Sequence, residues 1–257
     1  MPVYLTEHGR SILVELRGIA ILCKLIPADN RGFNERLEEQ DRVRKSQMTE
    51  QFRASLKPGQ EMPQVSFPWV SPTDQNRTYT KALEKFVTES AICRAVDLYH
   101  WYLRRTLGLA LSRDSSLIHS WASTLGITNK KAVEIESAAS LEGLRGKELR
   151  FRELVHQDMS VPPLGVIPAL VEVRNCIVHQ RGYDLDNKIR EIVVSSPELG
   201  IIVDARTVRI TPDVAQSAVE RLYSDISIID QVLGNVLGVP RRAEPMPELK
   251  RYYGTGE

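Results

Sequence analysis

Hydrophobic residues recur every three or four positions along most of this chain, which is the spacing of amphipathic helices. The first such stretch covers 7–26, and Pro27 is expected to end it. Residues 33–57 alternate acidic and basic side chains, which predicts a solvent-facing helix held by charge pairs three and four positions apart. The following stretch, 58–74, is rich in proline and is predicted to be a linker.

A long helix is expected soon after this linker. Residues 79–111 place large apolar side chains on one stripe, as a core-facing helix does: Val96, Tyr99, Leu103, Leu107 and Ala110. A short helix is predicted over 115–126, with Gly126 closing it.

The next segments also favour helices. Residues 128–159 are expected to form two of them, separated near Gly143 or Gly146. A further helix is predicted over 166–181, and Gly182 suits the position that caps its carboxyl end.

After residue 182 the spacing of hydrophobic residues is no longer that of a helix. Three short β-branched runs, at 190–194, 200–204 and 207–210, predict a small strand pair or meander inserted between helices. The last helix begins at Thr211, a natural N-cap, and Pro212 suits its first position. Its buried stripe is expected to hold Val214, Ala218, Leu222, Ile226, Ile229 and Leu233.

These elements predict a mainly α protein: an antiparallel helical bundle with a small β-strand insertion before the last helix. The domain prediction has an N-terminal helical extension (1–57), a proline-rich linker (58–74), a helical domain (75–238) and a flexible tail (239–257). The chain lacks the βαβ rhythm, the glycine-rich phosphate loop and the HExxH and GxSxG motifs that mark several large enzyme classes.

The amino-acid composition excludes some classes of function. The net charge is +1, which argues against a broad polyanion-binding surface and leaves room for a small phosphate site. The three cysteines, Cys23, Cys93 and Cys176, form no CxxC pair, so we expect neither a disulfide framework nor a metal site, and a reducing compartment. Charged residues interrupt the most apolar early stretch, so no membrane span is expected and the predicted location is the cytoplasm.

A cluster of polar residues interrupts an apolar helix in the segment "VEVRNCIVHQRGY", residues 171–183. At 100° per residue, Glu172, Asn175 and His179 fall close together, and Arg174 lies about 140° from His179. Arginine offers a planar fork to phosphate, and histidine exchanges a proton near neutral pH. The residue types suit a phosphate site, although a structural helix-end pair at a subunit interface would use them too.

The run "RNCIVHQRG" resembles the signature of HEPN domains. That pattern is an arginine, then four to six residues of which the first is polar and often asparagine, then a histidine. Arg174, Asn175 and His179 occupy these positions, and the resemblance covers about 75–238, including a glycine soon after the histidine and a long final helix. It implies a HEPN-like helical bundle over that range.

In that family many members are endoribonucleases that need no metal or other cofactor, and two protomers place both motifs in one cleft. The resemblance implies that His179 is the general acid or base, that Arg174 stabilises phosphate charge and that Asn175 orients them. Glu172 is a candidate support, and Arg181 a candidate second phosphate contact. Some members carry a regulatory tyrosine two residues after the histidine, whereas here that position is Arg181 and the tyrosine is Tyr183.

The predicted function is therefore a homodimeric, metal-independent endoribonuclease that binds RNA through the HEPN-like domain and leaves 2′,3′-cyclic phosphate ends. This activity would suit a toxin or an antiviral defence effector that an antitoxin or another regulatory protein controls. Two alternatives remain open: a catalytically inert HEPN-like module that binds a nucleotide or a partner, and a helical scaffold whose first 70 residues recruit a partner.

Overall fold

The computed structural model describes residues 6–57, 72–113, 115–128, 144–184 and 187–238. Most of the predicted linker, the whole predicted tail and most of the first helix predicted within 128–159 lie outside these residues. The last three positions of the predicted linker, 72–74, are helical, so the linker was predicted to end too late. The protein is mainly helical, with a two-stranded sheet before the last helix, as the hydrophobic pattern predicts. None of the described helices is both long enough and apolar enough to cross a membrane.

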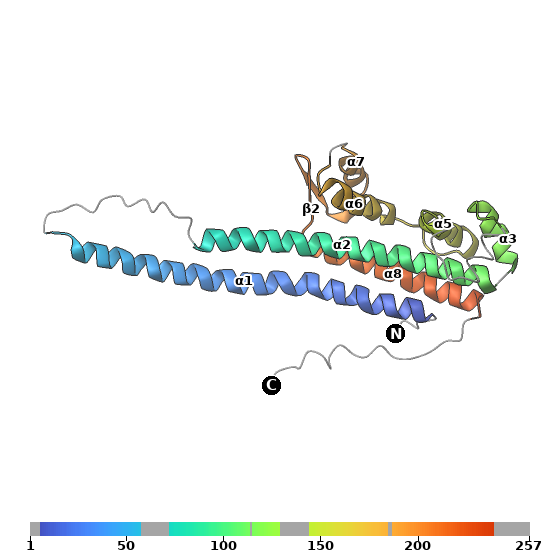
Figure 1. Cartoon of the computed structure of the whole chain (residues 1–257), viewed down its shortest axis with the longest axis horizontal. Helices are drawn as coiled ribbons and strands as arrows, with labels where there is room; N and C mark the ends of the chain where they lie inside the picture. The colour runs from blue at the N-terminus through green and yellow to red at the C-terminus, as the bar shows by residue number, and fades with distance from the viewer. Residues whose placement is uncertain (1–5, 58–71, 114, 129–143, 185–186, 239–257) are drawn as a thin grey trace, which may run out of the picture.

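Three long helices form the body of the molecule: α1 (Glu7–Ser55), α2 (Pro72–Arg113) and α8 (Pro212–Val236). Figure 1 shows α1 running antiparallel to both α2 and α8. The predicted stripes of α2 and α8 face the core between them; all five predicted α2 residues are at most 1% exposed, and of the α8 stripe only Val214 is less than fully buried. Thr211 caps α8 as expected, because its hydroxyl accepts from the Val214 N–H.

The predicted break at Pro27 is wrong, because α1 continues through it as one helix of 49 residues. Proline fixes φ within the helical range, so the chain can continue at the loss of one hydrogen bond and about 3 kcal/mol relative to alanine. Packing before the proline holds the helix in place: Ile12, Leu13 and Leu16 are buried in the same core as α2 and α8.

Smaller elements cover one side of α2. Figure 1 places α6 (Ile167–Gln180) and α7 (Lys188–Ser195) beside the middle of α2, with α5 (Glu148–Met159) and α3 (Ser115–Thr124) nearer its carboxyl end. The short 3-10 helix η2 (Pro197–Leu199) leads to strands β1 (Ile202–Asp204) and β2 (Thr207–Arg209). The strands pair antiparallel with Val203 opposite Val208, which confirms the predicted strand pair.

The run 190–194 is helical, so its prediction as a strand is wrong. The buried carboxylate of Asp184 accepts hydrogen bonds from the backbone N–H groups of Ile189 and Arg190, which satisfies donors at the start of α7. Ile189, Ile192 and Val193 then share one helix face that packs on the core. The capping residue, Asp184, lies outside the run 190–194. The β-branched composition of that run therefore does not reveal that it belongs to a helix.

A buried carboxylate ties the start of α1 to α2 and α8. Asp230 accepts hydrogen bonds from the backbone N–H of Thr6 at 3.0 Å, from the Thr6 hydroxyl at 2.6 Å and from the Tyr102 hydroxyl at 3.0 Å. Gly9 makes room for this carboxylate, because a Cβ at that position would lie 2.4 Å from Asp230 Oδ2.

We expect Gly9→Ala to lower the free energy of unfolding by about 1–3 kcal/mol, since an added methyl group must displace a buried, hydrogen-bonded carboxylate. Gly18→Ala is the matched control: the same helix leaves open space there, so the better helix propensity of alanine should raise stability by up to about 1 kcal/mol. Urea denaturation measures both, and equal shifts of the same sign would contradict the role of Gly9.

Candidate functional site at the carboxyl end of α6

Helix α6 is held against the molecule by its apolar face. Leu170, Val173 and Cys176 are buried, and the polar residues between them are left at the sides of the helix. The helix ends at Gln180, and both Arg181 and Gly182 adopt left-handed backbone conformations, with φ of 54° and 77°. The Gly182 N–H donates to the Cys176 carbonyl at 3.2 Å, which satisfies the helix end.

Arg174 lies against α2 and is only 25% exposed. Its Nη2 forms an ion pair with Asp97 Oδ1 at 2.8 Å, and its Nη1 donates to Asn175 Oδ1 at 3.3 Å. Its Nε is buried and has no hydrogen-bond partner among the described residues. Two contacts therefore fix the guanidinium group, and its buried Nε–H is left without an acceptor among the described residues.

His179 is exposed on the last turn of α6, and the described residues offer its ring no hydrogen-bond partner. The five-residue separation puts His179 about 7.5 Å along the axis from Arg174 and about 140° around it. Asn175 bonds to Arg174 and makes no hydrogen bond to His179. Within one chain, the structure joins Arg174 to Asn175 and leaves His179 apart from both.

The other predicted residues have local roles in the structure. Glu172 forms an ion pair with Lys188 at 2.7 Å, which links α6 to α7 and does not reach Arg174 or His179. Arg181 is exposed and directly follows Gln180, the last residue of α6. Tyr183 forms an isolated β-bridge with Thr207, and its side chain is 50% exposed.

Sequence reasoning missed a row of polar residues on the face of α2 that meets α6. Glu89, Cys93, Asp97 and His100 are spaced four, four and three apart, which places them on one side of the helix. That spacing was a detectable signal, but only the position of α6 shows that they adjoin Arg174. In the described part of the chain, no three acidic, histidine or cysteine side chains come together as metal ligands would.

Burial sets the electrostatics of this row. Burial raises the pKa of the Glu89 carboxyl, while nearby Lys85 opposes the shift. Burial also raises the pKa of the Cys93 thiol and lowers the pKa of His100, an effect that the charge of Glu148 opposes. Glu89 Oε1 and His100 Nε2 are buried without hydrogen-bond partners among the residues described.

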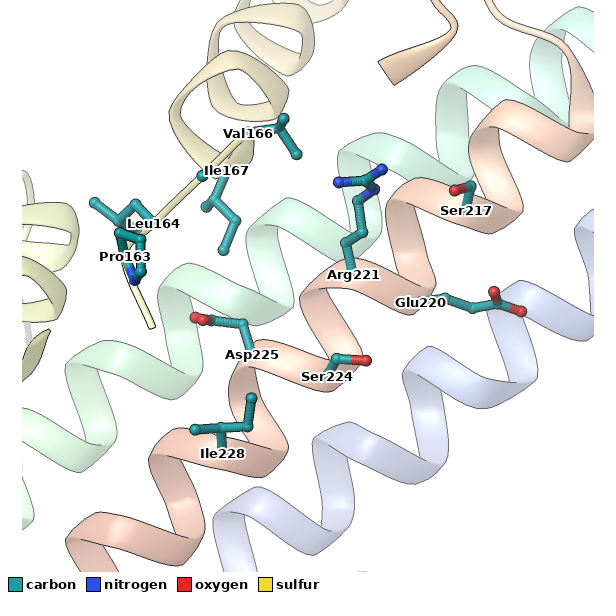
Figure 2. A pocket seen from close by; sticks show the side chains of 11 residues that line it. Pro163, Leu164, Val166, Ile167, Ser217, Glu220, Arg221, Ser224, Asp225 and Ile228 are labelled. Carbon is teal, nitrogen blue, oxygen red and sulfur yellow. The ribbon is translucent and has the colours of Figure 1, made fainter. Parts of the chain in front are cut away.

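A hollow lies at the opposite end of α6 from His179. It has a volume of about 370 Å³ and is formed by Pro163–Ile167 and the outer face of α8. Figure 2 shows Asp225 pointing toward Pro163, with the end of Arg221 near Val166. Because about 18 Å of helix separates Ile167 from His179, this hollow is not part of the motif.

Glu89 gives a pH-dependent prediction. Its raised pKa means that the folded state binds this proton more tightly than the unfolded chain, so its contribution to stability falls as the pH rises above about 4.3, the ordinary value. Glu89→Gln should therefore be more stable than the wild type at pH 7, and this advantage should shrink toward pH 4. Urea unfolding at both values tests it, with exposed Glu50→Gln as the control; an advantage independent of pH would contradict it.

Comparison of the chain with models of known protein families, with curated protein sequences and with solved structures finds no match in any of the three. The HEPN resemblance and the functions that it implies therefore remain predictions.

Proposed function

We propose that this protein is a metal-independent endoribonuclease of HEPN type, with His179 as its acid–base residue and Arg174 as its phosphate contact. The observation that carries the proposal is the position of His179: a solvent-exposed imidazole, with no described hydrogen-bond partner, at the end of the helix that also holds Arg174. A toxin or defence effector acting on cytoplasmic RNA, restrained by an antitoxin or other regulatory protein, fits this activity.

The chemistry requires two proton transfers. The 2′-hydroxyl of RNA attacks the adjacent phosphorus while a base removes its proton, and the bond to the 5′-oxygen breaks while an acid protonates that oxygen. The products are a 2′,3′-cyclic phosphate and a 5′-hydroxyl, and a nearby cation stabilises charge on the phosphate during the reaction. One histidine in each chain cannot supply the acid and the base together, whereas a symmetric dimer provides two.

The surroundings of His179 support a dimer through this end of α6. Val178 and Tyr183, on either side of it in sequence, are 48% and 50% exposed, and Ile202 in the neighbouring hairpin is 51% exposed. Exposed large apolar side chains are a feature that interaction surfaces share. A two-fold axis at this surface would bring two copies of His179 to one RNA phosphate.

The direct test is incubation of the purified protein with RNA in EDTA, followed by identification of the product ends. We expect cleavage that leaves 2′,3′-cyclic phosphates, and no cleavage of the same RNA carrying 2′-O-methyl groups, because the attacking hydroxyl is then blocked. The absence of cleavage, or cleavage of the methylated RNA, would exclude this mechanism.

One observation favours an inert nucleotide- or partner-binding module as the second candidate. Arg174 is already paired with Asp97, so a phosphate must compete with that carboxylate. If this pair persists, Arg174 makes no phosphate contact, so the protein should not cut RNA, and both Arg174→Ala and His179→Ala should leave RNA binding unchanged. In the endoribonuclease, by contrast, Arg174→Ala should weaken RNA binding. Fluorescence anisotropy with an RNA oligonucleotide distinguishes the two functions.

A further inference from the structure

The second half of α1 extends beyond the rest of the described molecule. The Arg94–Glu15 ion pair fixes the antiparallel alignment of α1 and α2, so the first residue of α2 lies opposite about residue 37 of α1. Figure 1 shows the carboxyl end of α1 reaching well past the start of α2. No described side chain of α1 after Cys23 is buried. We call residues 35–55 the α1 arm.

Charge is divided between the two halves of the α1 arm. Residues 35–41 hold four acidic side chains and one basic one, whereas 42–53 hold four basic side chains and one acidic one. The acidic residues of the first half are Glu35, Glu38, Glu39 and Asp41, and the basic residues of the second are Arg42, Arg44, Lys45 and Arg53. In an antiparallel pair the net-acidic half of one arm would lie against the net-basic half of the other, whereas a parallel pair would place halves of like net charge together.

One face of the arm has the spacing of a coiled-coil seam. Leu37, Asp41, Arg44 and Met48 are separated by four, three and four positions, as the inward-facing residues of a coiled coil are. Around a two-fold axis between positions 41 and 44, each Leu37 would face Met48 of the other copy, and each Asp41 would face Arg44. Met48 is 37% exposed, so it is accessible for such a contact.

We propose that the α1 arm binds the α1 arm of a second copy of this chain in antiparallel orientation. The same surface serves on both chains, as a two-fold interface requires. The opposed charges set the direction, and the Leu37–Met48 contacts supply the apolar centre. A seam this short buries little surface, so the association depends on protein concentration and weakens with salt.

This interface is separate from the one that the proposed function uses. Gly182, at the end of α6, adjoins Glu89 on α2, which lies opposite about residue 20 of α1. The arm axis near position 43 is then about 34 Å away along the bundle, so an arm dimer holds its two α6 ends about 70 Å apart. Arm contacts and RNA cleavage can therefore succeed or fail independently.

Three charge variants test the proposal. The basic-arm variant carries Glu35→Lys, Glu38→Lys and Glu39→Lys, the acidic-arm variant carries Arg42→Glu, Arg44→Glu and Lys45→Glu, and the swapped variant carries all six changes. In sedimentation equilibrium at low salt, we expect the first two to show a lower mass than the wild type, because they lose the arm contact whether or not a contact at α6 forms. The swapped variant and an equimolar mixture of the first two should recover the wild-type mass.

The circular-dichroism spectrum of every variant is the control. A helical spectrum shows that a variant that no longer associates is still folded. A monomeric wild type, unchanged masses in the single-sign variants, or no recovery on mixing would each overturn the arm interface. His179→Ala measured beside them addresses only the proposed ribonuclease, because that residue is far from the arm.

Discussion

His179→Ala is expected to lower the rate of RNA cleavage by about two to four orders of magnitude, the usual contribution of a positioned acid–base group. Because His179 is exposed and has no described hydrogen-bond partner, the change should leave the urea midpoint unaltered. Initial rates on a labelled RNA in EDTA measure the effect.

His156→Ala serves as the matched control, since that ring makes a hydrogen bond with the Val161 carbonyl in the loop after α5. It should reduce stability and leave cleavage by the folded protein intact. Equal cleavage rates for both histidine variants would remove His179 from the mechanism.

Subunit mixing extends this prediction to the shared site. If each reaction needs both copies of His179, a dimer of one wild-type and one His179→Ala chain is inactive. Activity should then fall with the square of the wild-type fraction after the two proteins are mixed and allowed to exchange. A linear decrease would show that each chain acts alone.

The largest expected effect on stability comes from Arg152, whose side chain is fully buried. Its Nε and Nη2 donate to the two carboxylate oxygens of Asp225, at 3.0 and 2.6 Å, and the Tyr99 hydroxyl donates to the same carboxylate at 2.6 Å. Nη2 also donates to the Pro162 carbonyl. One buried ion pair thus ties α5 to α8, α2 and the loop before α6.

We expect Arg152→Met to lower the free energy of unfolding by about 3–5 kcal/mol, because it leaves the carboxylate of Asp225 buried without its cation. The double variant Arg152→Met with Asp225→Leu should recover most of this loss, since it removes the isolated charge. Urea denaturation measures all three proteins.

The exposed pair Arg150–Glu153 on the same helix provides the control. Arg150→Met should change stability by no more than about 1 kcal/mol, because solvent already screens that pair. If Arg152→Met cost no more than Arg150→Met, the buried pair would not be holding these elements together.

Much of the fold could be predicted from the sequence because hydrophobic period and caps are local. The stripe of α2, the Thr211 cap of α8 and the strand pair around 202–209 all follow from residues close together in the chain. The errors at Pro27 and at 190–194 arose where distant or flanking groups outweigh local composition. Packing of 7–25 on the bundle carries α1 through Pro27, and Asp184 starts α7 from outside its β-branched run.

The same distinction between local sequence and distant contacts applies to the candidate site. The sequence by itself determined that Arg174, Asn175 and His179 share the end of one helix, because helical spacing requires no other part of the chain. Only the tertiary structure decided that Arg174 pairs with Asp97 and Glu172 with Lys188, and that His179 faces solvent. Those outcomes depend on which elements pack beside α6, and an ion pair forms with whichever charge the fold brings within reach.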